Sequence, residues 1–245
     1  DETWEEYPLR HDITAAGVTA ADRADVILSP GSLTAAAECG IPVTNLPDTV
    51  TDSTAELAIG LMLAVSRRIG ENSLRAREEA PENLFGMGRS MGRSLRGQML
   101  GLLGCGRIGK RTAEIAAALG MRCIGYSRHG VNHPQVESVT LPELLAQSDV
   151  LSLHCPLTQE TRRLLDRSAL ARMKQGSILI NTARGAIVDC DALADALESG
   201  HLRGAGLDVY PDEPHIPPRL IALPQVVLTP HIGTNTQETR QRMAE

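Results

Sequence analysis

The stretch Gly101-Leu-Leu-Gly-Cys-Gly-Arg-Ile-Gly-Lys110 contains three glycines at the spacing G-x-G-x-x-G. An apolar run at 99–103 leads into it and is short enough for a buried strand. After the glycines, residues of one helical face recur at steps of three and four: Ile108, Thr112, Ile115 and Leu119. Gly120 ends this pattern. We therefore predict a strand, a glycine turn and a helix, the context in which this motif binds a dinucleotide.

Each glycine has a predicted task in that turn. Gly104 permits the tight turn, Gly106 lets a pyrophosphate approach the backbone, and Gly109 lets the helix and strand pack closely. The backbone N–H groups at the helix start favour an anion. Many sequences with this spacing are only tight turns, so the flanking helix and a second expected strand at 121–126 carry the prediction.

The composition indicates a globular protein with few aromatic residues. Of 245 residues, 42% are hydrophobic and only 2% aromatic, so Ala, Leu, Ile and Val must build the core. The net charge of −6 without a basic block argues against nucleic acid or an anionic membrane as a partner. The longest apolar run, 57–65, is far shorter than the roughly 20 residues of a spanning helix.

The cysteines and the absence of a visible secretory signal favour a reducing cytoplasm. The five cysteines are odd in number and form no C-x-x-C pair. We therefore expect no disulfide framework and no metal site.

Before the glycine turn, the pattern is harder to interpret. We expect a strand within 24–29, a short helix at 34–39 and a strand at 41–44. The S-x-x-E sequence that begins at Ser53 predicts a capping box. A long linking helix should follow, with one apolar face: Leu57, Leu61, Ala64, Val65 and Ile69. The Gly/Arg-rich arm 81–97 is interpreted as a solvated surface or a subunit contact.

From Gly97 onward, predicted strands and helices alternate. Thr140 begins a second capping box, and 191–199 forms a short amphipathic helix before Gly200. Such alternation predicts an α/β fold with a doubly wound parallel sheet, whose ligands bind at the carboxyl ends of the strands. The strands are expected at 99–103, 121–126, 149–153, 177–180, 204–209 and 226–228.

Ser127 and Arg128 follow the second strand, about 20 residues after the glycines, where this fold often carries an acid for the 2′-hydroxyl of NAD. A serine and an arginine offer donors and a cation instead, which suits a 2′-phosphate. We predict NADP(H) as the preferred cofactor, with NAD as the weaker alternative. The alternative interpretation is an ordinary surface arginine.

Five further motifs accompany the glycine loop: GIPVTN at 40–45, LHCPLT at 153–158, NTARG at 181–185, GLDVYPDEP at 206–214 and TPHIG at 229–233. Together they resemble the D-isomer-specific 2-hydroxyacid dehydrogenase family, which includes glyoxylate and hydroxypyruvate reductases. The resemblance implies a Rossmann nucleotide-binding domain at 46–233. It also implies a flavodoxin-like substrate domain at 1–45, to which 234–245 returns.

The same resemblance implies a catalytic triad of Arg184, Glu213 and His231. The chemistry of these groups agrees with that implication. Reduction of a 2-oxo acid needs a hydride at C2 and a proton for the developing alkoxide, and histidine is a natural donor near neutral pH. A carboxylate stabilises the imidazolium, and an arginine binds the substrate carboxylate. Taken alone, His231 would instead be interpreted as a structural or surface histidine.

The cofactor set is also implied by the resemblance. Arg107 and Ile108 are expected to offer backbone N–H groups to the pyrophosphate. Asp208 is expected to accept from the nicotinamide carboxamide, beside Thr182; alone, it would equally suit a cap or an ion pair. Further residues that are expected to line the cofactor cleft are His154, Pro156, Ala183 and Gly233.

The front of the chain departs from the family. The G-x-G-x-D-like loop that binds the substrate carboxylate is not recognisable before Gly40, and the last residue is Glu245, where relatives usually have another helix. We therefore expect a shortened substrate domain, a trimmed variant or a fragment. Ser29, Gly31 and Ser32 are the candidates for replacing that loop.

The favoured function is NADP-dependent reduction of a small 2-oxo acid such as glyoxylate or hydroxypyruvate. One alternative is a phosphite-type or formate dehydrogenase on the same scaffold, although formate dehydrogenases carry glutamine where Glu213 stands. The other is a non-catalytic, dinucleotide-sensing module. The family also implies a homodimer, joined through about 54–97.

Overall fold

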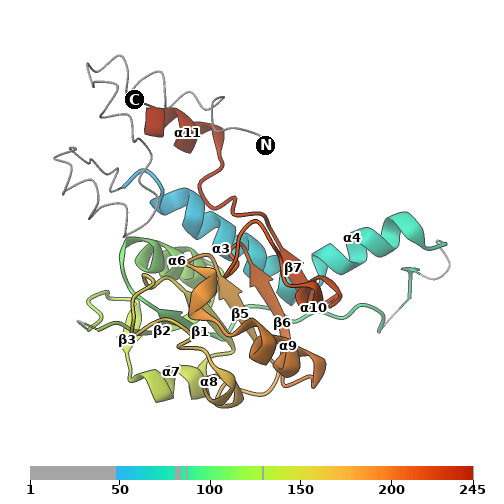
Figure 1. The fold of residues 1–245 in the computed structure, drawn as a ribbon, viewed down its shortest axis with the longest axis horizontal. Helices are drawn as coiled ribbons and strands as arrows, with labels where there is room; N and C mark the ends of the chain where they lie inside the picture. The colour runs from blue at the N-terminus through green and yellow to red at the C-terminus, as the bar shows by residue number, and fades with distance from the viewer. Residues whose placement is uncertain (1–47, 81–83, 87, 129, 245) are drawn as a thin grey trace. The chain divides into compact units, whose positions relative to one another are not determined.

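The computed structural model describes residues 48–80, 84–86, 88–128 and 130–244 (Figure 1). The chain divides into two compact units, Thr51–Gly233 and the combination of Asp1–Val50 with Thr234–Glu245. In the second unit, the structure describes helix α11 (Gln237–Ala244). The elements expected at 24–29, 34–39 and 41–44, and the candidates Ser29, Gly31 and Ser32, lie outside the described residues. The substrate domain therefore stays a prediction.

The larger unit is built on a parallel sheet whose described strands follow the order β3-β2-β1-β4-β5-β6-β7. Every neighbouring pair is parallel. The order reverses between β1 and β4, which confirms the predicted doubly wound α/β fold. The strands are β1 (Met99–Leu103), β2 (Arg122–Tyr126), β3 (Val136–Ser138), β4 (Val150–Leu153), β5 (Ser177–Asn181), β6 (Leu202–Leu207) and β7 (Val226–Leu228).

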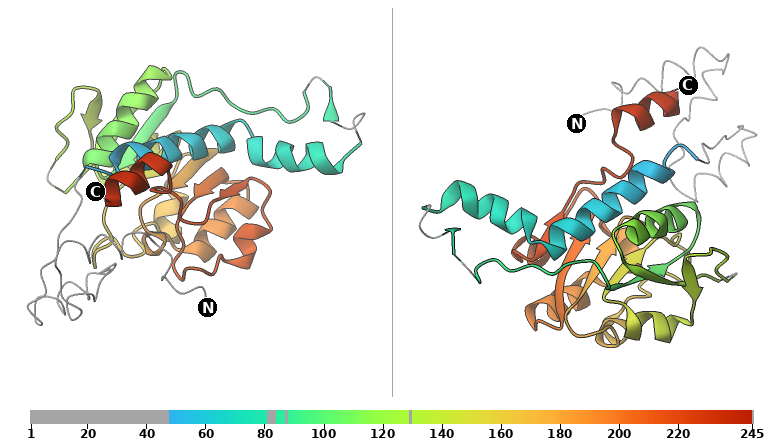
Figure 2. Two further views of the ribbon diagram at one scale, coloured as in Figure 1. Left: turned by 90° about the horizontal axis from the view of Figure 1, so that it is seen from above. Right: turned by 180° about the vertical axis from the view of Figure 1, so that it is seen from behind.

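Alternate strand residues feed two separate cores, one on each face of the sheet. Leu100 and Ile178 pack beneath α3 (Thr51–Ser66) and α6 (Arg107–Ala118). Leu151 and Leu179 pack on the opposite face, and Figure 2 shows the two layers of helices on either side of the sheet. The second layer consists of α7 (Leu141–Gln147), α8 (Arg167–Ala171), α9 (Cys190–Glu198) and α10 (Pro218–Ile221). None of the helices formed by the described residues is both long and apolar enough for a bilayer crossing.

The long linking helix differs from its prediction at both ends. Helix α3 begins at Thr51, so Ser53 lies inside the first turn, and the predicted capping box there is wrong. The helix stops at Ser66, because Arg68 adopts a left-handed conformation and starts α4 (Ile69–Glu78). Ile69 is therefore exposed instead of continuing the apolar face. The capping box at Thr140 is confirmed, with Thr140 and Glu143 each bonding the other's backbone.

The helix after the glycine turn buries only part of the predicted face: Thr112 is buried and Ile115 packs against the core, but Leu119 does not. Its buried residues are Gly109, Thr112, Ala113 and Ala116, whereas Leu119 is exposed. Small side chains are needed on this face because α6 packs against both the sheet and α3. The short strand β3 was not predicted, since Val-Glu-Ser has only one apolar residue. Strand β6 ends at Leu207, so Asp208 lies beyond the strand.

The close approach of α3 to β6 yields a stability prediction. A Cβ at Gly206 would lie 2.9 Å from Leu61 Cβ on α3 and 3.0 Å from Ile180 Cδ1 on β5. We expect Gly206→Ala to lower the free energy of unfolding by about 1–3 kcal/mol, because overpacking must displace a helix or a strand. Urea unfolding measures this effect.

The matched control is Gly60→Ala in α3, where an added Cβ meets no heavy atom within 4 Å. Since alanine has the higher helix propensity, this variant should be about 1 kcal/mol more stable. Equal effects of the two substitutions would contradict the packing account.

Candidate functional site

The predicted site residues gather along the carboxyl edge of the sheet, because all of the strands run in parallel. Backbone hydrogen bonds continue one residue past the strands and hold neighbouring loops side by side. These bonds are Gly104 N–H to Tyr126 O, His154 N–H to Leu103 O, Asp208 N–H to Asn181 O and Thr229 N–H to Leu207 O, each 2.8–2.9 Å long. The loops after β1, β4, β5, β6 and β7 therefore form one continuous rim.

The glycine turn has the geometry that its sequence predicts. Gly104 has φ +98°, and a Cβ there would lie 2.6 Å from Cys155 N, so this position requires glycine. A Cβ on Gly109 would overlap the carbonyl oxygen of Gly104. At Gly106, by contrast, a Cβ meets nothing within 4 Å. No side chain caps α6, so Arg107 and Ile108 present its amino end to the open space beside Gly106.

After β2, Ser127 bonds to the glycine turn. Its Oγ accepts from Cys105 N at 2.6 Å, and the same hydroxyl also interacts with the Cys105 thiol. Arg128 is exposed beside it. The carboxylate of Glu160 acts electrostatically on this guanidinium from the loop after β4.

His154 lies deep in the rim and packs against Gly109. Its Nε2 lies 2.9 Å from Ser152 Oγ. Burial lowers the pKa of His154 to about 4, so this imidazole is neutral near pH 7. A neutral, buried imidazole has no proton to donate on this nitrogen pair beyond its single N–H, and its expected place in a cofactor cleft stays a prediction. Pro156 is exposed, and its carbonyl accepts from Thr161 Oγ1 at 2.7 Å.

The loop after β5 is organised by Asn181, which is 1% exposed. Its Nδ2 donates to Arg184 O and its Oδ1 accepts from Ala183 N, both at 3.0 Å. These bonds fold the backbone of the N-T-A-R segment into a tight turn. Thr182 Oγ1 is buried there without a hydrogen-bond partner.

His231 and Glu213 form the central pair of the rim. His231 Nδ1 lies 2.7 Å from Glu213 Oε2, and their side chains are 51% and 35% exposed. When Glu213 is a carboxylate, Nδ1–H donates to it and Nε2 is the end of the ring available to another molecule. The other oxygen, Oε1, accepts from Tyr210 N at 3.0 Å. Both carboxylate oxygens thus have defined partners.

The backbone that carries Arg184 lies against the loop of Glu213, but the Arg184 guanidinium does not contact the His231–Glu213 pair. Its Nη1 donates to Ala183 O at 2.6 Å, and the side chain is exposed. The following residue, Gly185, packs so tightly against Tyr210 that a Cβ would overlap the Tyr210 carbonyl. The structure therefore brings the segments of all three predicted catalytic residues together, whereas only His231 and Glu213 touch through side chains.

Asp208 holds a neighbouring loop in place, a structural role that the sequence suggested only as the alternative to cofactor binding. The residue is 1% exposed. Its Oδ1 accepts from Thr229 Oγ1 at 2.6 Å and from Ile232 N at 2.8 Å, and its Oδ2 accepts from Gly233 N at 2.9 Å. The carboxylate therefore holds the 229–233 loop. Its expected contact with a carboxamide stays a prediction, for which Oδ2 retains a lone pair.

Two residues that organise the site were missed in the sequence, Asn181 and Tyr210. A buried asparagine directly after a strand is a recognisable signal for a turn. Tyr210 gave only a weak signal, because a tyrosine after a strand equally suits ordinary core packing.

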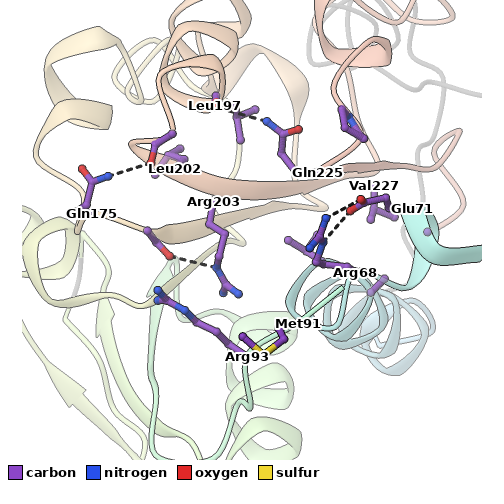
Figure 3. A pocket seen from close by; sticks show the side chains of 16 residues that line it. Arg68, Glu71, Met91, Arg93, Gln175, Leu197, Leu202, Arg203, Gln225 and Val227 are labelled. Atoms are coloured by element: carbon purple, nitrogen blue, oxygen red, sulfur yellow. Dashed lines mark hydrogen bonds and ion pairs between the residues drawn. The ribbon is translucent and has the colours of Figure 1, made fainter. Parts of the chain in front are cut away.

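A separate pocket of about 530 Å³ lies at the opposite, amino edge of the sheet (Figure 3). Arg93 and Arg203 point toward each other there, and Arg68 pairs with Glu71. The pocket shares no residue with the His231–Glu213 rim. The described residues contain no cluster of metal-ligating side chains.

Comparison with known proteins identifies relatives of this chain. The family model described as "D-isomer specific 2-hydroxyacid dehydrogenase, NAD binding domain" matches residues 59–233. A glyoxylate reductase of Thermococcus litoralis is 46% identical over 215 residues, which cover 84% of this chain and 64% of that protein. A hydroxypyruvate reductase of Thermotoga maritima is 42% identical, with 90% and 72% covered.

Among solved structures, the TT0316 protein from Thermus thermophilus superimposes with a TM-score of 0.81 at 49% identity. The match covers 87% of this chain and 68% of that one. The chain thus spans less than two thirds of the glyoxylate reductase that it matches.

The glycine turn predicts a separation between folding and binding. Gly106→Ala adds a methyl group to open space, so its free energy of unfolding should stay within about 0.5 kcal/mol of the original. The same methyl group occupies the space that a pyrophosphate needs, so dinucleotide affinity should fall at least tenfold in fluorescence titrations. The comparison variant is Gly109→Ala, which should destabilise the protein because it overlaps Gly104 O. Unchanged affinity in Gly106→Ala would place the dinucleotide elsewhere.

Proposed function

Because this chain belongs to the D-isomer specific 2-hydroxyacid dehydrogenase family, we propose that it reduces a small 2-oxo acid with NADPH. Glyoxylate and hydroxypyruvate are the favoured substrates, since proteins named for these reductions are 42–46% identical to it. Where C2 becomes chiral, the product is the D-2-hydroxy acid. The single observation that carries the proposal is the 2.7 Å contact between His231 Nδ1 and Glu213 Oε2.

The described residues fit a nicotinamide dinucleotide. Gly106 borders open space at an uncapped helix start, which suits a pyrophosphate. Thr182 Oγ1 is a buried hydroxyl without a partner, which suits a polar group of the cofactor. When bound, the cofactor supplies the hydride.

The chain's own residues then manage the proton and the substrate charge. His231 holds the proton on Nε2 that passes to the carbonyl oxygen of the substrate, and the Glu213 carboxylate orients the ring through Nδ1. Arg184 binds the substrate carboxylate and polarises the carbonyl. For this, its guanidinium turns from Ala183 O toward the His231–Glu213 pair.

The preference for NADPH rests on Ser127 and Arg128. Ser127 places a hydroxyl, a donor that suits a phosphate oxygen, directly beside the glycine turn. Arg128 supplies an exposed cation beside it. Neither residue presents a carboxylate that would repel a 2′-phosphate.

We also propose a homodimer and a cytoplasmic location. Large apolar side chains are exposed on α4 and on the segment after it, with Leu74 at 60%, Phe85 at 80% and Met91 at 72%. An exposed apolar group of this kind is typical of an interaction surface. The four described cysteines are free, as a reducing compartment allows.

The first prediction concerns His231. His231→Asn should lower kcat by about 10²–10⁴-fold, because the proton donor is lost. The decrease in NADPH absorbance with glyoxylate, hydroxypyruvate and pyruvate measures it. His215→Asn, at an exposed histidine of the neighbouring loop, is the control and should retain activity. Turnover like that of the unaltered protein in His231→Asn would rule out this role. Tight NADPH binding without turnover of any 2-oxo acid would favour the dinucleotide-sensing alternative.

The second prediction concerns the cofactor. The kcat/KM for NADPH should exceed that for NADH, and Arg128→Ala should reduce this ratio about 10- to 100-fold, because a charge-assisted contact with the 2′-phosphate is lost. Arg122→Ala, at an exposed arginine at the start of β2, should not change the ratio. An NADH value equal to or above the NADPH value contradicts the assignment.

The third prediction concerns assembly. Sedimentation velocity at micromolar concentration should show a dimer, and Phe85→Glu should shift it toward monomer because a charge replaces an apolar contact. Ile221→Glu places the same charge on the exposed apolar residue of α10 and should leave the dimer intact. A clean monomer of the unaltered protein contradicts the proposal.

A further inference from the structure

Tyr210 lies between β6 and Glu213 and is only 6% exposed. It packs into the core on the side of the sheet that α7, α8, α9 and α10 cover. Burial, followed by the charge of Asp208, raises the pKa of Tyr210 to about 12. The phenol is therefore a neutral hydrogen-bond donor throughout the working pH range.

The hydroxyl of Tyr210 spans the ends of β6 and β7. Its single proton is shared between Leu207 O at 3.1 Å and Thr229 O at 2.9 Å. Thr229 O also accepts from the backbone N–H of His231 at 3.1 Å. The phenol and the His231 backbone thus meet on the same carbonyl oxygen.

The backbone of Tyr210 reaches the other half of the pair. Its N–H donates to Glu213 Oε1 at 3.0 Å, and Glu213 Oε2 bonds His231 Nδ1 at 2.7 Å. Tyr210 is therefore linked to the His231–Glu213 pair in two ways. Its hydroxyl reaches His231 through Thr229 O, and its amide binds Glu213 directly. The Arg184–Gly185 segment packs against the carbonyl of the same residue. One tyrosine therefore touches the segments of Arg184, Glu213 and His231.

His231 needs such support because its backbone is held in an unfavourable conformation. Its φ is +53°, in the left-handed region that is unfavourable for a residue with a side chain. That conformation persists only where surrounding contacts over-determine it. The contacts are Asp208 O and Thr229 O on the His231 amide, and the Asp208 carboxylate on the two following amides.

We infer that Tyr210 is a positioning residue, which uses its buried hydroxyl to set where His231 stands relative to Glu213. This inference rests on the proposed function, because the pair that it positions is the proposed proton donor and its carboxylate. The hydroxyl of Tyr210 is buried on two backbone carbonyls, so Tyr210 acts through Thr229 and His231.

Tyr210→Phe tests the inference, because it removes the hydroxyl and leaves the ring and the backbone amide. We expect kcat with glyoxylate to fall about tenfold, while KM for NADPH and NADPH affinity stay unchanged. The thermal midpoint should fall by no more than about 2–4 °C, the effect of one net hydrogen bond. The control is Tyr126→Phe, whose hydroxyl makes no hydrogen bond to the described residues and whose loss should change none of these values.

A second measurement does not depend on activity. Proton NMR of the unaltered protein should show a downfield Nδ1–H resonance from the His231–Glu213 bond, assigned by its loss in His231→Asn. In Tyr210→Phe this resonance should broaden or disappear, and in Tyr126→Phe it should persist. Unchanged kcat with an intact resonance would overturn the inference. A loss of NADPH affinity equal to the loss in kcat would also overturn it, since Tyr210 would then support the cofactor site. If the unaltered protein reduces no 2-oxo acid, the proposed function fails, while the resonance still decides whether Tyr210 positions the pair.

Discussion

The buried carboxylate of Asp208 is the constraint on which the rest of the site depends. It stands directly after β6 and accepts three hydrogen bonds from the 229–233 loop. Two of the donors are the backbone amides of Ile232 and Gly233, and leaving such an amide unpaired in a buried setting would cost about 1–3 kcal/mol. These bonds hold the loop in the arrangement in which His231 contacts Glu213. The sequence suggests that Asp208 contacts a ligand, whereas the fold uses its carboxylate to hold the backbone of the 229–233 loop.

The second constraint is the lack of space around the backbone. Gly104, Gly109 and Gly185 each lie where a Cβ would overlap another backbone segment, and Gly206 lies close beneath α3. These contacts bring the loops of the rim within hydrogen-bonding distance of one another. Gly106 is different, because its missing Cβ borders open space. Glycine is thus required for close packing at these four positions, whereas in our proposal Gly106 is required because a ligand approaches it.

The two edges of the sheet are chemically distinct. The carboxyl edge carries the neutral His154, the His231–Glu213 pair and the Ser127–Arg128 step, which together suit proton transfer and a phosphorylated cofactor. The amino edge carries a pocket lined by Arg68, Arg93 and Arg203. Parallel strands produce this separation, since all of their carboxyl ends lie on the same side.

Much of this protein was predictable from local pattern. Alternating apolar runs predicted six of the seven described strands, and motif order placed His231, Glu213 and Arg184 at strand ends. The pattern was wrong where tertiary contacts decide the outcome, at the exposed Leu119 of α6, at the helix break at Arg68 and at the short strand β3. By itself, then, the sequence determined the doubly wound sheet and the residues at its edge, because periodicity and glycine spacing are local properties. Only the tertiary structure decided that Asp208 and Tyr210 hold His231 against Glu213, because those hydrogen bonds join segments about 20 residues apart that meet only once β6 and β7 pair.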